Sequence, residues 1–214
     1  MCALAPPVEG RWKTFLIKSS PQEGARPSGC VAPVVGVTII SDDLAEEVFH
    51  MRALSMDEAL AIIQNTFHEA AEMKAHALAA IVLDAGGQVK AFLKQDGASI
   101  KRFEIARGKA FASLAMHRSS RQVLQKAREK PLFMETLRAI SDGPIFLEAG
   151  GQLIRDSAGE IVGAIGVTGD VNEVDDLCAM AGIRAAGFLC DDDFSEADCR
   201  RLNIKKDAPI KDPR

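Results

Sequence analysis

The sequence predicts an α+β fold in which a mainly antiparallel sheet of about five strands is covered by helices. Two observations identify the elements: apolar residues recur at helical spacing in some segments, and short apolar runs bounded by turn residues indicate strands in others. The third observation is their order, which is helix, two strands, helices, three strands, helix. Because turns of hairpin length join consecutive strands antiparallel, we expect no parallel βαβ unit.

The first helix is predicted over residues 55–73. Ser55 followed by Glu58 is the pattern of a capping box, in which each side chain bonds the backbone N–H of the other residue. Apolar or small residues then recur at helical spacing: Ala59, Ile62, Ile63, Thr66, Phe67, Ala70 and Met73. One face of this helix is therefore expected to be buried.

A β-hairpin and a helix rich in small residues follow. Residues 77–83 and 89–93 are apolar runs on either side of the turn Asp84-Ala-Gly-Gly. Residues 100–117 return to helical spacing. Small residues line the middle of this segment: Ala106, Gly108, Ala110, Ala112 and Ala115. They allow a second backbone to approach closely, so we expect this helix to pack tightly on the sheet or on a second subunit.

Two shorter helices and three strands are predicted next. The helices are expected at residues 120–129 and 132–140, before the stop signal Asp142-Gly143-Pro144. The strands are expected at residues 145–149, 152–155 and 161–167. Glycine-containing turns separate the three strands.

The last predicted helix covers residues 172–186, with Asn172 or Thr168 as its N-cap and Gly187 as its terminator. Residues 52–188 then form the domain. Residues 1–51 are rich in proline and are expected to be a mostly irregular extension, with a strand at 34–40 and a short helix at 42–51. Residues 189–214 are predicted to be a polar, solvated tail.

Composition excludes several classes of function. Lys+Arg 26 against Asp+Glu 30 gives a net charge of -4, which lacks the basic excess of a nucleic-acid-binding protein. The five cysteines are odd in number and widely spaced, so neither a disulfide framework nor a metal site is predicted. The longest apolar run, residues 31–40, is too short to span a bilayer. A cytoplasmic protein without nucleic-acid or membrane partners is therefore expected.

The glycine series Gly163-Ala-Ile-Gly-Val-Thr-Gly169 lies between a predicted strand and a helix, where phosphate-binding loops occur. Its spacing matches neither G-x-G-x-x-G nor the Walker pattern that ends in Gly-Lys-Ser/Thr. The carboxylates of residues 170–176 would also repel a phosphate. Close packing of backbones accounts for these glycines better. A neutral or carbonyl-bearing ligand against this backbone is a third alternative.

The histidines are few, and none is paired with another at metal-ligand spacing. A haem iron needs an axial His, Cys, Met or Tyr, and the chain has no Tyr. His68, His76 and His117 are therefore the candidate axial ligands. The alternative for His68, on the polar face of the first helix, is simple solvation; His117 ends a helix, where a cation complements the helix dipole.

Lys109 lies among small residues, with Asp96 and Glu104 upstream. Partial burial would suit this lysine to proton transfer or to binding a carboxylate such as a haem propionate. The alternative is that its ammonium simply reaches water. Cys178 is expected to be a small core residue.

Several segments resemble the GlcG/HbpS-like family of haem-binding or haem-degrading domains, which also includes the C-terminal domain of PduO. These segments are Leu83-Asp-Ala-Gly-Gly-Gln-Val89, Gln95-Asp-Gly-Ala98, Glu104-Ile-Ala-Arg-Gly-Lys-Ala110, Gly150-Gly151, Gly159-Glu-Ile-Val-Gly-Ala-Ile-Gly-Val-Thr-Gly169 and Asp175-Asp-Leu-Cys-Ala-Met-Ala-Gly182. Together they span about two thirds of the chain in the family's order. The resemblance implies a profilin-like fold and assembly into homo-oligomers.

The resemblance also implies a function. The leading hypothesis is a haem- or tetrapyrrole-binding protein, with Lys109 against a propionate and Thr168 and Gly169 beside the ligand. The second is a cofactor-independent lyase or isomerase acting on a small carboxylated substrate, in which Lys109, Asp96 and Asp175 exchange protons. The third is a structural partner in an oligomer.

Overall fold

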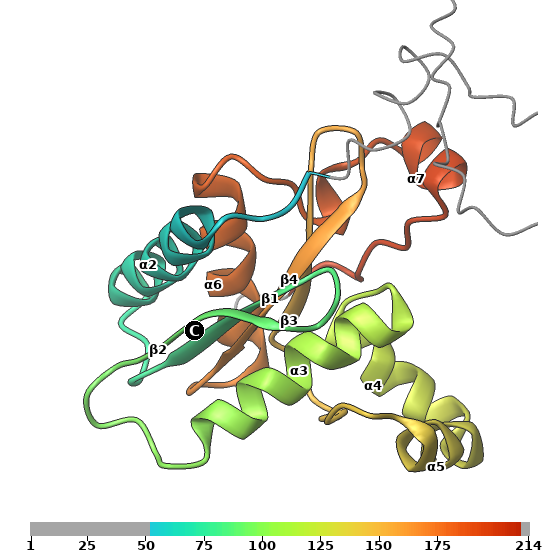
Figure 1. Cartoon of the computed structure of the whole chain (residues 1–214), viewed down its shortest axis with the longest axis horizontal. Coiled ribbons are helices and arrows are strands. Elements are labelled where there is room, and N and C mark those ends of the chain that lie inside the picture. Colours follow the sequence, from blue (N-terminus) through green and yellow to red (C-terminus); the bar gives the residue numbers. More distant parts are fainter. Residues whose placement is uncertain (1–51, 211–214) are drawn as a thin grey trace, which may run out of the picture. The chain divides into compact units, whose positions relative to one another are not determined.

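The computed structural model describes residues 52–210, and within this range it is an α+β fold (Figure 1). The predicted strand at 34–40 and helix at 42–51 lie outside the described residues. The elements are α2 (Met56–Glu72), β1 (Ala79–Asp84), β2 (Val89–Lys94), α3 (Arg102–Met116), α4 (Ser120–Glu129), α5 (Pro131–Ile140), β3 (Gly151–Arg155), β4 (Ile161–Thr168), α6 (Asn172–Ala185), the 3-10 helix η1 (Asp191–Asp193) and α7 (Glu196–Leu202).

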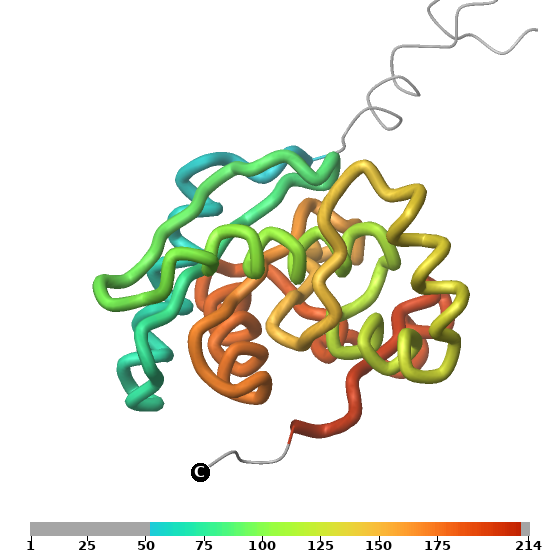
Figure 2. Tube along the Cα trace, turned by 90° about the horizontal axis from the view of Figure 1, so that it is seen from below, coloured from blue at the N-terminus to red at the C-terminus, as the bar shows by residue number. Residues whose placement is uncertain are grey.

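The four strands form one antiparallel sheet in the order β2-β1-β4-β3, which confirms the predicted antiparallel pairing. Helices α2 and α6 cover one face of the sheet, and α3 covers the other (Figures 1 and 2). Side chains of β1 alternate between the two cores: Ala80 and Val82 join the α2–α6 side, and Ile81 and Leu83 join the α3 side. Burial on both faces explains why β1 is a continuous apolar run.

Helix α2 begins as predicted and packs against α6. Ser55 and Glu58 form both hydrogen bonds of the capping box. At the crossing with α6, a Cβ on Gly182 would overlap Thr66 Oγ1 and lie 2.7 Å from the carbonyl oxygen of Ile62. The two helix backbones therefore touch at a position that tolerates only glycine. The predicted N-cap of α6 is wrong, because Val171 holds that position without a side-chain cap.

Helix α3 approaches the sheet through glycines, as its small residues predict. A Cβ on Gly166 of β4 would overlap the Ala106 carbonyl of α3, and one on Gly151 of β3 would overlap the Lys109 carbonyl. On α3 itself, Gly108 faces the backbone of Phe146, whose N–H donates to the Gly108 carbonyl at 3.2 Å. The middle of α3 is thereby enclosed on two sides.

The contact with Phe146 explains why the prediction of a strand at residues 145–149 is wrong. This segment crosses α3 and gives a backbone N–H to the helix, so it does not pair with the sheet. The described sheet has four strands where about five were expected. Residues Ile145 and Ala149 are nevertheless buried, which accounts for the apolar pattern that suggested a strand.

The prediction of a solvated tail after residue 189 is also wrong for the described part of it. Phe194, Cys199 and Ile204 form a small apolar cluster with η1 and α7 around them. Leu189 exchanges two backbone hydrogen bonds of 2.9 Å with Arg155 at the edge of the sheet. The apolar residues of this cluster are widely spaced among many charged residues, so the composition of the segment predicted a polar tail.

Across residues 52–210, no helix combines the length and the apolar character needed to cross a membrane.

Replacing Gly182 with valine is expected to destabilise the protein by about 3 kcal/mol or more, because the new side chain must separate α2 from α6. The matched control is Ala185→Val at an exposed position of α6, for which helix propensity alone predicts a loss of about 0.5 kcal/mol. Urea unfolding followed by circular dichroism measures both. Equal stabilities of the two variants would contradict the tight crossing.

Candidate functional site

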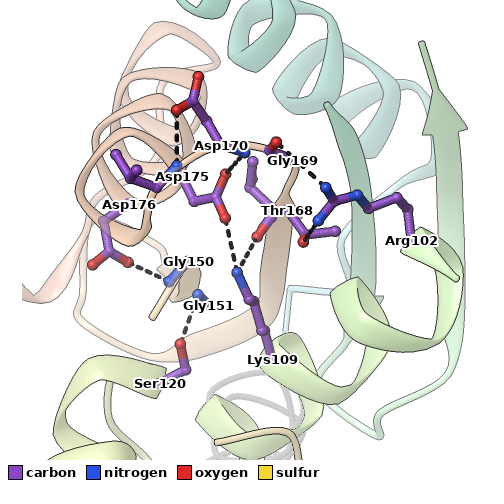
Figure 3. A network of polar contacts seen from close by, with 12 residues as sticks. Arg102, Lys109, Ser120, Gly150, Gly151, Thr168, Gly169, Asp170, Asp175 and Asp176 are labelled. Atoms are coloured by element: carbon purple, nitrogen blue, oxygen red, sulfur yellow. Dashed lines mark hydrogen bonds and ion pairs between the residues drawn. The ribbon is translucent and has the colours of Figure 1, made fainter. Parts of the chain in front are cut away.

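A buried ion pair lies where β4 ends and α6 begins. Lys109 Nζ donates to Asp175 Oδ2 at 2.8 Å and to the Val167 carbonyl at 3.1 Å (Figure 3). The side chains of Lys109 and Asp175 are only 2% and 1% exposed. Lys109 projects from α3 and Asp175 from the first turn of α6, so the pair joins helices on opposite faces of the sheet.

Asp175 has further partners that fix its carboxylate. Its Oδ1 accepts the backbone N–H of Asp170 at 3.1 Å, and Asp170 Oδ2 accepts the backbone N–H of His76 at 2.7 Å. Burial raises the pKa of Asp175 to about 6, although the charge of Lys109 and its hydrogen bond act in the opposite direction. This carboxyl group therefore titrates close to physiological pH.

The neighbouring carboxylate, Asp176, is fully buried and binds a second set of groups. Its Oδ1 accepts the Gly150 N–H at 2.7 Å and Gln152 Nε2 at 3.0 Å, and its Oδ2 accepts Arg121 Nε at 2.7 Å. Burial raises the pKa of Asp176, opposed chiefly by the charge of Arg121. Ser120 Oγ accepts the N–H of Gly151 at 2.8 Å, so the turn before β3 is anchored by α4 and α6 together.

Sequence reasoning missed Arg121 and Gln152 as partners of Asp176. Arg121 belongs to a helix of mixed charge, where any of several cations was equally plausible. Gln152 offered a usable signal, because it is a polar residue directly before the apolar residues Leu153 and Ile154 of a predicted strand, and a polar group that such a strand buries needs a partner.

The predicted residues Thr168 and Gly169 lie beside the ion pair at the end of β4. Thr168 Oγ1 accepts Arg102 Nη1 at 2.8 Å, and the Gly169 carbonyl accepts Arg102 Nη2 at 3.4 Å (Figure 3). Arg102 opens α3, so this contact holds the start of α3 against the end of β4. Figure 3 shows Lys109, Thr168 and Asp175 close together at this end of β4.

The remaining predicted residues are not gathered at this place. Asp96 is exposed in the connection between β2 and α3. His68 is exposed on α2, and His76 is exposed next to Asp170. His117 is exposed at the C-terminal end of α3, in the left-handed conformation (φ 48°). The three histidines therefore do not form one site within a single subunit.

The burial of Lys109 corrects one prediction. An ammonium that is enclosed and held by Asp175 and Val167 has no open side from which to reach a haem propionate. In this arrangement Lys109 binds protein groups and not a carboxylated ligand. The same burial closes the pair to a substrate unless α3 and α6 move apart.

Two hollows on the surface lie around His117, away from this ion pair. One of about 320 Å³ is bordered by His117, Leu114, Ile161 and Leu202, with Arg155 at its side. Arg155 ends β3 and is itself buried, with Nε donating to Asp191 Oδ1 at 2.6 Å and Nη1 donating to the Gly159 carbonyl at 2.8 Å. Sequence reasoning missed this second buried ion pair, since Asp191 lies in the segment expected to be a tail.

The described residues contain no group of three or more His, Cys, Asp or Glu side chains placed to hold a metal ion. Cys178 is fully buried in the α2–α6 core, as predicted. The described residues thus offer a closed acid–base pair at the end of β4 and, away from it, the exposed imidazole of His117 beside a surface hollow.

Comparison with known proteins gives one family. The family model described as "Haem degrading protein HbpS-like" matches residues 54–184. No relative was found among curated proteins.

Solved structures show the same fold at low sequence identity. The PduOC:heme complex is 20% identical, with 64% of this chain and 96% of that chain covered and a TM-score of 0.56. Klebsiella pneumoniae protein ORFY is 19% identical, with 62% and 90% covered and a TM-score of 0.55. A double mutant of Streptomyces reticuli HbpS is 24% identical, with 74% and 99% covered and a TM-score of 0.57.

Lys109→Met is expected to destabilise the protein by about 3–5 kcal/mol, because it leaves the Asp175 carboxylate buried without its cation. The double variant Lys109→Met, Asp175→Asn removes both charges and should recover much of that loss. Urea unfolding of the two variants tests this. A double variant no more stable than the single one would show that the ion pair is not what the lysine contributes.

The carboxyl carbon of Asp175 is expected to titrate with a midpoint near pH 6, measured by ¹³C NMR with Asp175→Asn to assign the signal. Since the pKa is raised on folding from 3.8, the folded protein holds a proton between these values that the unfolded chain has lost. This contribution to stability is complete below about pH 3.8 and is lost as the pH rises through about 6. A midpoint at or below 3.8 would contradict the effect of burial.

Proposed function

The chain belongs to the HbpS-like family of haem-degrading proteins, and from that membership we propose that it binds haem or a related tetrapyrrole. The observation that carries the proposal is the family match over residues 54–184, together with the fold that the chain shares with the PduOC:heme complex. When bound, haem would supply iron chemistry; the chain would supply an axial ligand and a surface for the ring. As part of this proposal, the protein is a cytoplasmic homo-oligomer with a small-molecule ligand.

The donors of the described chain are compatible with haem. Three imidazoles, those of His68, His76 and His117, are exposed and accessible to an iron atom. Of these, His117 also borders a hollow of mixed lining, in which Leu114 and Ile161 lie beside polar residues. An imidazole at the border of a hollow that includes some apolar side chains favours His117 on one subunit.

The size of that hollow has a consequence for the assembly. About 320 Å³ lies at the small end of the range for small-molecule sites, roughly 300–1,000 Å³. A tetrapyrrole would extend beyond it, and a second subunit would then cover the rest of the ring. His68 on the surface of α2 stays a candidate ligand in such an assembly.

The role of Lys109 changes under this proposal. Its ion pair with Asp175 fixes the end of β4, and the less enclosed cations near His117, Lys205 and Arg118, are better placed to meet propionates. Thr168 and Gly169, bound by Arg102, likewise support the fold around this end of β4.

The second candidate function, a cofactor-independent lyase or isomerase, has one observation in its favour. Asp175, with its pKa raised to about 6, contacts Lys109 beside the backbone of β4, which is a pair suited to proton exchange. Burial of both side chains weighs against it, and Asp96 lies away from the pair. The third candidate, a structural partner, has no separate observation in its favour.

Titration of the purified protein with haemin is expected to give a saturable Soret band, and replacing the axial histidine should abolish or shift it. Three variants, His68→Ala, His76→Ala and His117→Ala, are compared. Each serves as the control for the other two, because all three histidines are exposed and their removal should leave the fold intact. Circular dichroism checks that folding.

Loss of the band in one variant alone identifies the ligand. The absence of any Soret change on the wild-type chain, or identical spectra for the wild type and all three variants, would refute binding through these histidines.

A further inference from the structure

A second hollow, next to the one beside His117, collects positive charge. It has a volume of about 180 Å³, and three cationic residues border it, Arg118, Arg155 and Lys205, together with His117 and Asn203. None of the described residues that border it is an aspartate or a glutamate. We infer that this hollow is a binding site for a small oxyanion, a phosphate or a carboxylate group.

Arg155 gives the site a fixed donor. Its backbone is held by the two hydrogen bonds to Leu189, and its guanidinium by Asp191 and the Gly159 carbonyl. Those two side-chain bonds use two of the five N–H groups of an arginine. A guanidinium held in one orientation with N–H groups to spare is suited to binding phosphate or carboxylate oxygens, because little entropy is lost when the anion binds.

Arg118 and Lys205 reach the hollow from two different segments. Arg118 follows α3, where its Nε donates to the Met116 carbonyl at 3.1 Å, and Lys205 follows α7. Lys205 is held in place through its backbone, since its carbonyl accepts Gln122 Nε2 at 2.6 Å. Three cations from segments far apart in the sequence therefore meet at one small hollow.

A competing explanation is that Arg118 and Lys205 merely compensate two helix dipoles, because α3 and α7 both end at the hollow. Each helix C-terminus carries about half a negative charge, so two of them contribute about -1. Asp191 cancels the charge of Arg155, leaving Arg118 and Lys205 as two cations. Among the residues that border this smaller hollow, the balance stays positive by about one charge before any contribution from His117, so dipole compensation does not account for the whole cluster.

The residues around the neighbouring hollow indicate which part of the ligand is charged. It shares His117, Arg155, Ile161 and Leu202 with the cationic one, so the two are continuous. Glu160 is the one acidic residue among those described along either border, and it lies on the larger hollow. The anionic group of a ligand is thus directed to the smaller hollow, and an uncharged remainder fits the larger one.

Isothermal titration of the haem-free chain with inorganic phosphate, in a buffer of low ionic strength without phosphate, tests the site. Saturable binding with a dissociation constant below about 1 mM is expected. The double variant Arg118→Ala, Lys205→Ala should weaken binding by about tenfold or more, since it removes two charge-assisted partners. Lys205 is exposed and Arg118 is half-buried, and neither contributes to the buried pair of Arg155 with Asp191, so that pair is left intact.

The matched control is Lys101→Ala, an exposed lysine paired with Glu104 at 3.1 Å and not part of the border of the hollow. It should bind phosphate as the wild type does, within about twofold. A parallel titration with malonate separates the two sources of oxyanion: tighter binding of phosphate assigns a phosphoryl group, and tighter binding of malonate assigns a carboxylate.

No saturable heat with either anion would overturn the inference. So would equal weakening in the double variant and in Lys101→Ala, because that result would mean general screening and no site. Both outcomes are independent of haem, so they leave the haemin titration to be judged separately.

Discussion

The close approach of α3 to the sheet is the constraint on which the rest of the structure depends. Gly151 and Gly166 leave no Cβ between the helix backbone and the two strands. At this distance Lys109 does not reach water, and its ammonium needs a countercharge within the fold. Asp175 provides it from α6, on the opposite face of the sheet. A packing requirement for glycine therefore leads directly to a buried ion pair that locks both layers to the end of β4.

A second buried carboxylate, that of Asp176, fixes the neighbouring turn before β3. Asp176 follows Asp175 on α6, and its partners Gly150, Gln152 and Arg121 come from the turn before β3, from β3 itself and from α4. Asp176 alone thus satisfies donors from three other parts of the chain. Motifs separated by tens of residues, such as the glycine pair and the aspartate pair, are in this sense parts of one polar network.

Local signals predicted most of the elements, and long-range contacts decided the exceptions. The capping box of Ser55, the hairpin turn and the terminator Gly187 act within a few residues, so the sequence reveals them. The segment at 145–149 is apolar because it crosses α3. The spacing of its apolar residues alone does not distinguish such a crossing segment from a strand. For the site, the convergence of Lys109 with Asp175 followed from the family pattern, but their burial depends on packing that no motif encodes.

Burial also separates the residues that hold the fold from those able to meet a ligand. Lys109 and Asp175 are enclosed and mutually satisfied, and any role in binding would require α3 and α6 to separate against their shared ion pair. The surface near His117 has the reverse character: Arg118 and Lys205 follow helix ends, where partial negative charge favours cations, and only Arg155 there is neutralised by a buried acid. Cations placed at helix ends stabilise the fold and remain open to solvent, so the same side chains are able to serve both structure and recognition. Ligand recognition in this molecule is therefore expected at the surface near His117, Arg118 and Lys205 and not at the buried pair of Lys109 with Asp175.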